Sequence, residues 1–252
     1  MKQIRVYLLL TFLISWFFWG VRILAQNDLI PSFFSMVGPI GVFGPFIAFI
    51  VIKKREGRQV WLEIKKMFHI RSSKGIIFFS IMSPIVLSLI AYLLLLQNNQ
   101  ASFELGLTLQ MIPLVGVIIL VTGGPLEEFG WRGYLLPKIR NSYGFLVTAG
   151  IIGLIHGLWH LPLHFTEGTV QEVIPVSEYI AITILGAVSY SFIFEYTKSI
   201  TPMIILHWLS NLSSAVFVYW QDSYGRYMLF VITIVLDVVL VLYYRKRHRQ
   251  LT

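Results

Sequence analysis

Apolar residues dominate long stretches of the chain, and short polar segments separate these stretches. The apolar runs approach about 20 residues, the length that an α-helix needs to cross a bilayer. We expect about eight membrane-spanning helices, over residues 6–26, 33–52, 76–96, 106–136, 145–163, 178–197, 202–220 and 226–244. The pattern therefore predicts an all-α fold, a polytopic transmembrane helix bundle that forms a single domain over residues 1–252.

The fourth apolar segment, 106–136, is too long for one simple crossing. Gly123, Gly124 and Pro125 lie within it. Proline removes a helical hydrogen bond and glycine tolerates the bend, so we expect a kink at this point.

Composition supports a membrane protein. The chain of 252 residues is 56% hydrophobic and only 13% charged, whereas soluble domains are about 25% charged. It contains no cysteine, which excludes disulfides, thiolate metal sites and a cysteine nucleophile.

The net charge of +8 is distributed unevenly along the chain. With both termini in the cytoplasm, only three of the 20 Lys and Arg residues fall outside the inner segments: Arg22, Arg132 and Arg226. The expected outer loops carry acids instead: Asp28, Glu104, Glu167, Glu172 and Asp222. Basic residues gather on the cytoplasmic side of membrane proteins, so we expect both termini inside and a cell-membrane location.

Because the basic clusters flank apolar spans, we expect contact with membrane lipid and no nucleic-acid binding. The charged loop 53–74 is either an amphipathic surface helix or solvated.

Ionisable side chains inside spans point to chemistry, since each costs about 2.5–3.5 kcal/mol at the bilayer centre on insertion scales. The polar residues in question are Arg22, Glu127, Glu128, Arg132, His156, His160, Glu195, His207 and Asp237, with Asn211 as a neutral companion.

The stretch GGPLEEFGWRGYLLP, residues 123–137, holds three of these charges. Glu128 and Arg132 are four residues apart, so they share a helix face in the favourable ion-pair order. Glu127 is rotated from Glu128 by about 100° and is free to point elsewhere. A purely structural charge cluster is the alternative interpretation.

Two further stretches carry paired polar residues four apart. HGLWH places His156 and His160 on one face, and HWLSN does the same for His207 and Asn211. Taken alone, the first pair favours interhelical hydrogen bonding over catalysis or metal binding. The second pair is as consistent with hydrogen-bonded packing as with an oxyanion site.

Taken in order, the three stretches resemble the CAAX-protease and bacteriocin-processing family of intramembrane proteases, whose pattern is EExxxR, FxxxH, then HxxxN or HxxxD. Here these are Glu127 to Arg132, His156 to His160 and His207 to Asn211. The resemblance covers about residues 107–220, the expected catalytic core. His156 departs from the pattern, because the family usually has Phe or another apolar residue there.

The resemblance implies proteolysis of a membrane-associated peptide. Glu127 is then the general base, His160 its partner in holding water, and His207 with Asn211 the oxyanion pair. Glu128 and Arg132 would support the site. The family is often described as metalloproteases, and Glu127, His160, His207 and His156 are the candidate zinc ligands. We favour a mechanism without a cofactor, since there is no HExxH motif.

Two other functions compete with proteolysis. A non-enzymatic bacteriocin-immunity protein would keep the motifs only as structure, and a proton-coupled transporter would use buried Glu, His and Asp residues as a relay. Against the transporter, the chain shows no pair of matching broken segments in two halves. The expected substrate is a prenylated CAAX tail in a eukaryote or archaeon, and a leader-type peptide in a bacterium.

Overall fold

The computed structural model describes residues 2–68, 74–98, 105–122 and 124–249 of the chain, and these residues contain helices and no strands. Arg71 of the charged loop 53–74, together with Glu104 and Gly123, lies outside the described residues. The elements are α1 (Lys2–Gln26), η1 (Ser32–Phe43), α2 (Gly44–Arg55), α3 (Val60–Met67), α4 (Lys74–Gln97), α5 (Met111–Thr122), η2 (Gly124–Glu127), α6 (Glu128–Gly130), η3 (Trp131–Leu135), α7 (Leu136–Arg140), α8 (Phe145–Trp159), η4 (Leu161–Phe165), η5 (Val170–Val173), α9 (Val176–Thr197), α10 (Thr201–Val216), η6 (Tyr219–Gln221) and α11 (Ser223–Arg249).

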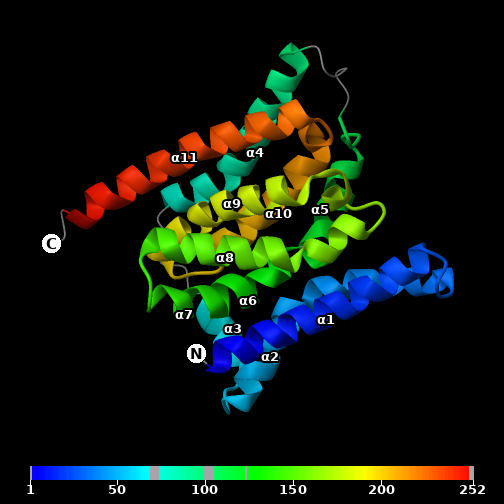
Figure 1. Cartoon of the computed structure of the whole chain (residues 1–252). Coiled ribbons are helices and arrows are strands. Elements are labelled where there is room, and N and C mark those ends of the chain that lie inside the picture. The colour runs from blue at the N-terminus through cyan, green and yellow to red at the C-terminus, as the bar shows by residue number, and fades with distance from the viewer. Residues whose placement is uncertain (1, 69–73, 99–104, 123, 250–252) are drawn as a thin grey trace.

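The helical bundle confirms the predicted fold class (Figure 1). Among the described residues, seven helical segments are long and apolar enough to cross a membrane. They correspond to seven of the eight expected spans. The remaining one, expected over 202–220, is α10, which has 16 residues and ends at Val216. Both chain ends lie toward the left of Figure 1, and their side of the membrane stays a prediction.

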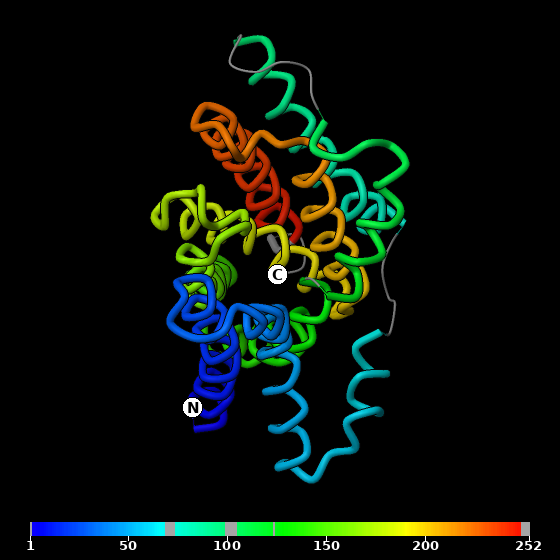
Figure 2. Tube along the Cα trace, turned by 90° about the vertical axis from the view of Figure 1, so that its right-hand side faces the viewer, coloured from blue at the N-terminus to red at the C-terminus, as the bar shows by residue number. Residues whose placement is uncertain are grey.

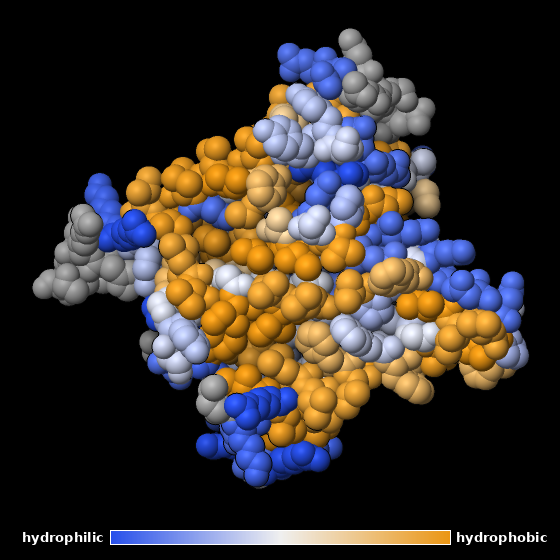
Figure 3. Space-filling view, viewed as in Figure 1, coloured by the Kyte–Doolittle hydropathy of each residue, from blue (hydrophilic) through white to orange (hydrophobic). Residues whose placement is uncertain are grey.

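Apolar side chains cover the outside of the bundle, as a lipid-facing surface requires. Leu9, Leu13 and Phe17 on α1 are each about 60% exposed, and apolar residues cover much of the face drawn in Figure 3. The interior holds large aromatic side chains, with Trp19, Trp131 and Trp159 almost fully buried. In the view of Figure 2, α1 and α8 lie on one side, and α10 with α4 lies on the other.

The fourth expected span is broken, as Pro125 predicts. Helix α5 ends at Thr122, the 3₁₀ turn η2 follows, and η3 is a short π-helix over Trp131–Leu135. A π-helical turn inserts an extra residue into the helix and is frequent at functional sites. These irregular turns place the two glutamates of the first motif inside the bundle, where Glu127 and Glu128 are both buried.

The charged loop 53–74 contains the short amphipathic helix α3. Trp61 and Leu62 are exposed on it, whereas Ile64 and Met67 pack against the core. The Met67 carbonyl also accepts a hydrogen bond from the backbone N–H of Ile200, at 2.8 Å. This helix therefore closes the bundle at the end where α10 begins.

Candidate active site

Three side chains from separate motif positions meet inside the bundle. Glu127 ends η2, His156 lies in the last turn of α8, and His160 follows that helix directly. Their exposed fractions are only 3%, 7% and 8%. The structure thus brings together the first two motifs, although Glu127 and His156 are 29 residues apart in the sequence.

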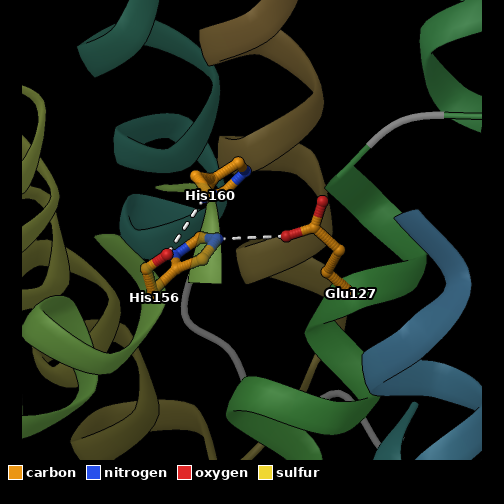
Figure 4. Close-up of side chains that lie close together, drawn as sticks. All are labelled: Glu127, His156 and His160. Atoms are coloured by element: carbon orange, nitrogen blue, oxygen red, sulfur yellow. Dashed lines mark hydrogen bonds and ion pairs between the residues drawn. The ribbon is translucent and has the colours of Figure 1, made fainter. Parts of the chain in front are cut away.

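Glu127 contacts His156 directly. The Nε2 atom of His156 lies 3.1 Å from Oε2 of Glu127 (Figure 4). An ionised carboxylate can only accept, so the imidazole N–H donates. Figure 4 shows the second carboxylate oxygen of Glu127 directed away from His156.

His160 is oriented by the backbone of the same helix. Its Nδ1 lies 3.0 Å from the carbonyl oxygen of His156. A carbonyl only accepts, so Nδ1 carries the proton, and the neutral ring keeps its lone pair on Nε2. That nitrogen can therefore accept a hydrogen bond from water or bind a metal.

Glu128, Arg132 and His207 form a second cluster. Arg132 Nη1 lies 3.0 Å from Glu128 Oε1, which confirms the ion pair expected from their spacing. The Nδ1 atom of His207 lies 2.6 Å from the same carboxylate oxygen. Glu128 thus joins the third motif to the first, a contact that spacing along the chain does not predict.

Tyr190 on α9 completes this cluster, and sequence reasoning missed it. The guanidinium of Arg132 lies over its ring, 3.9 Å from the centroid, and the ring also lies edge-on to that of His207. Such a contact is a cation–π interaction. A tyrosine within an apolar run carries no signal that distinguishes this role from ordinary packing.

Gly124 explains how His207 comes so close to η2. A Cβ atom at this position would lie 1.9 Å from Nε2 of His207. Only glycine leaves room for the imidazole there.

A cavity of about 1060 Å³ opens from these residues between α9 and α10. Glu127, His156, His160 and His207 line it at one end. Asn211 also lines it, and no hydrogen bond of its side chain is found among the described residues. Hydroxyl groups are frequent along its walls, among them those of Ser177, Thr183, Ser189, Ser210 and Ser214. The cavity is large enough for a peptide segment and offers partners for its backbone.

The other ionisable residues of the spans make separate contacts. Arg22 donates to the carbonyl of Glu167, and Glu195 pairs with Arg140 and Lys198. Asp237 is buried, and its carboxylate has no hydrogen-bond partner in the part of the chain that the structure describes.

The site also offers ligands of the kind that zinc binds. One oxygen of Glu127 and one nitrogen each of His156 and His160 lie within 4.8 Å of one another. Two histidines and a glutamate are a known catalytic zinc set, with bonds of about 2.0–2.2 Å. The donor types fit, provided that the side chains move inward. His207, a further candidate ligand, directs its Nδ1 to Glu128 instead.

Comparison with known proteins gives matches over the segment that contains the three motifs. Residues 109–213 match the model of a family described as type II CAAX prenyl endopeptidase Rce1-like. The chain is also 22% identical over 236 residues to CAAX prenyl protease 2 of Methanococcus maripaludis, covering 87% of this chain and 86% of that protein. Both matches confirm the resemblance drawn from the three motifs. Seven apolar helices long enough to cross a membrane indicate a multi-pass membrane protein, and this chain is similar to CAAX prenyl endopeptidases.

Proposed function

We propose that this protein cleaves a membrane-associated peptide with a water molecule activated by Glu127. The observation that carries the proposal is the placement of the Glu127 carboxylate, which is buried, lines the cavity and lies beside two histidines. A general base must lie within hydrogen-bond reach of the proton that it removes. Water between the free oxygen of Glu127 and Nε2 of His160 would meet that requirement.

The reaction then follows from these positions. Glu127 takes one proton from the water, Nε2 of His160 accepts a hydrogen bond from the other O–H, and the hydroxide attacks the carbonyl carbon of the scissile peptide bond. The negative charge moves to the carbonyl oxygen of the tetrahedral intermediate. Glu127 returns its proton to the leaving amine as the C–N bond breaks, which restores the carboxylate.

His207 and Asn211 are proposed to stabilise the oxyanion. The Nδ1–H of His207 is committed to Glu128, so the Nε2 atom is the one proposed to donate to the oxyanion, which it does when the ring carries both protons. The amide of Asn211, four residues further along α10, supplies a second donor facing the same cavity. Donors placed where charge develops are a large catalytic contribution.

We propose that no metal is required. A zinc ion on Glu127, His156 and His160 would act as a Lewis acid toward water. However, the Nε2 atom of His156 is within hydrogen-bonding distance of Glu127, and a metal ligand needs that lone pair free. Cleavage is therefore expected to continue at an unchanged rate after dialysis against a strong chelator. Loss of activity with verified zinc removal, and its return with added zinc, would establish the metalloprotease instead.

The proposed substrates are peptides held at the membrane, either prenylated CAAX tails or leader-type peptides. The curated relative is named for CAAX prenyl cleavage, and the cavity walls combine apolar surface with hydroxyl groups. The cell membrane is the proposed location.

The test compares wild-type protein with Glu127→Gln and His160→Ala in proteoliposomes. The probes are a quenched farnesylated peptide with a C-terminal CAAX sequence and its unprenylated form. Mass spectrometry of membrane peptides from cells making each variant would detect other substrates. Removing a general base costs about 10²–10⁴-fold in rate, so we expect losses of this size for both variants.

Size-exclusion chromatography in detergent would verify that each variant is folded. Cleavage that persists undiminished in both variants contradicts the proposal. The proposal is also contradicted if no peptide in any of the three assays requires Glu127 for its cleavage. That result would favour a non-enzymatic protein.

A further inference from the structure

We propose that His156 is a positioning residue that holds the carboxylate of Glu127 in its reactive orientation. This inference rests on the proposed function, since it gives Glu127 a partner within the same reaction. The family pattern has an apolar residue at this position, so the histidine adds a hydrogen-bond donor that the three motifs do not contain.

The first argument is the contact itself. His156 Nε2 and Glu127 Oε2 are 3.1 Å apart, and both side chains are buried. In the part of the chain that the structure describes, the nearby guanidinium of Arg132 is paired with Glu128 instead. A buried carboxylate without a donor is costly, and its torsions would be free to turn either oxygen toward the water. The histidine donor removes this freedom.

The second argument is that His156 is itself fixed. Its ring lies 5.4 Å from that of Trp131, 5.8 Å from Trp159 and 4.8 Å from His160, measured between centroids. A donor held by packing of this kind can transmit a defined direction to its acceptor.

The third argument is that one residue orients both partners of the water. The side chain of His156 holds Glu127, and its backbone carbonyl holds Nδ1–H of His160. Substituting the side chain leaves the carbonyl in place. A His156 variant therefore loses the contact with Glu127 and keeps the backbone hydrogen bond that orients His160.

The experiment uses four variants in the proteoliposome assay: His156→Gln, His156→Asn, His156→Phe and the matched control His164→Gln. The side-chain amide of glutamine can place N–H near the imidazole Nε2 position, whereas asparagine is one methylene shorter and phenylalanine has no donor. His164 lies in the same segment, and its Nδ1 contacts the carbonyl of Ile174 and not the site.

We expect His156→Phe and His156→Asn to lower kcat by about 10–100-fold, the usual effect of losing an orienting partner or misplacing a reacting group. KM should stay within about twofold, because the role proposed for His156 is to orient Glu127 and not to hold the peptide. His156→Gln should recover most of kcat, and His164→Gln should match wild type. A role in packing alone predicts the reverse order, with phenylalanine tolerated best.

Two results would overturn the inference: wild-type kcat in folded His156→Phe, or equal losses in His156→Gln and His156→Asn. The second comparison still applies if the phenylalanine variant does not fold. Wild-type activity that is insensitive to Glu127→Gln would contradict the proposed function itself. Sensitivity to Glu127→Gln with tolerance of His156→Phe would reject only the positioning role.

Discussion

Arg132 shows how a charge is accommodated inside this bundle. It is only 1% exposed, and Glu128, which pairs with it, is fully buried. The guanidinium also stacks on Tyr190. Removing one member of a buried pair leaves the other charge uncompensated, which is usually far more costly than losing an exposed pair.

Arg132→Met is therefore expected to lower the free energy of unfolding by about 3–5 kcal/mol. Chemical unfolding in detergent micelles would measure the change. The control is Lys66→Met, which removes an exposed partner of Glu63 and should cost no more than about 1 kcal/mol. Adding Glu128→Gln to Arg132→Met should recover part of the loss. A cost equal to that of the control would show that Arg132 is solvated in the folded protein.

The contacts of single residues also show which pairs can and cannot be predicted from their spacing along the chain. The Glu128–Arg132 pair follows from a separation of four residues on one helix, so the sequence was sufficient to predict it. The contacts of Glu127 with His156 and of Glu128 with His207 join different helices. Their formation depends on how helices pack and on the irregular turn after Gly124, and no local pattern encodes either.

At the scale of the elements, α8 and α9 lie in close contact along their lengths. A Cβ atom at Gly153 of α8 would lie 2.4 Å from the backbone Cα of Ile184 on α9. Gly150, one turn earlier on the same helix, has nothing within 4 Å of that position. Small residues allow backbones to approach in membrane helix pairs, and α9 carries much of the cavity wall.

Gly153→Ala should therefore destabilise the protein by about 1–3 kcal/mol through overpacking. Peptide cleavage should fall with it, because α9 would move away from α8. Gly150→Ala places the same methyl group in open space and should leave both properties unchanged. Thermal unfolding in detergent, together with the cleavage assay, would compare the two; equal stability would refute the close packing.

The spans and breaks of the helices could be predicted from the sequence better than the contacts of single residues. Apolar runs predicted seven of the spanning segments, and Pro125 predicted the break in the fourth. The π-helical turn η3 was not predicted, because no residue type marks it. Helix α10 is shorter than the apolar run that suggested it, since the chain becomes extended at Phe217.

At the scale of the whole molecule, the uneven distribution of Lys and Arg predicts which end of the bundle faces the cytoplasm. The expected cytoplasmic end includes the loop between α7 and α8, and the cavity extends toward the opposite end, where α9 begins. Ser142 lies in that loop and Ser177 lines the cavity, and both are exposed.

The absence of cysteine allows a direct test with Ser142→Cys and Ser177→Cys, each the single thiol in its variant. In intact cells a membrane-impermeant maleimide should label the second variant. It should label the first only after the membrane is permeabilised. The opposite pattern would reverse the predicted orientation and place both termini outside.

The size of the cavity also has a consequence for the proposed proteolysis. An α-helix with its side chains is about 10–12 Å across and needs about 30 Å to span the bilayer. A space of about 1060 Å³ is too small for a helix of that length, so for the proposed protease we expect a membrane-spanning substrate to bend or unwind near the scissile bond. Residues that favour helix would protect a peptide from cleavage, and glycine or proline near the scissile bond would expose it. Helix propensity in the substrate would thus act as a selection rule, in addition to any recognition of side chains.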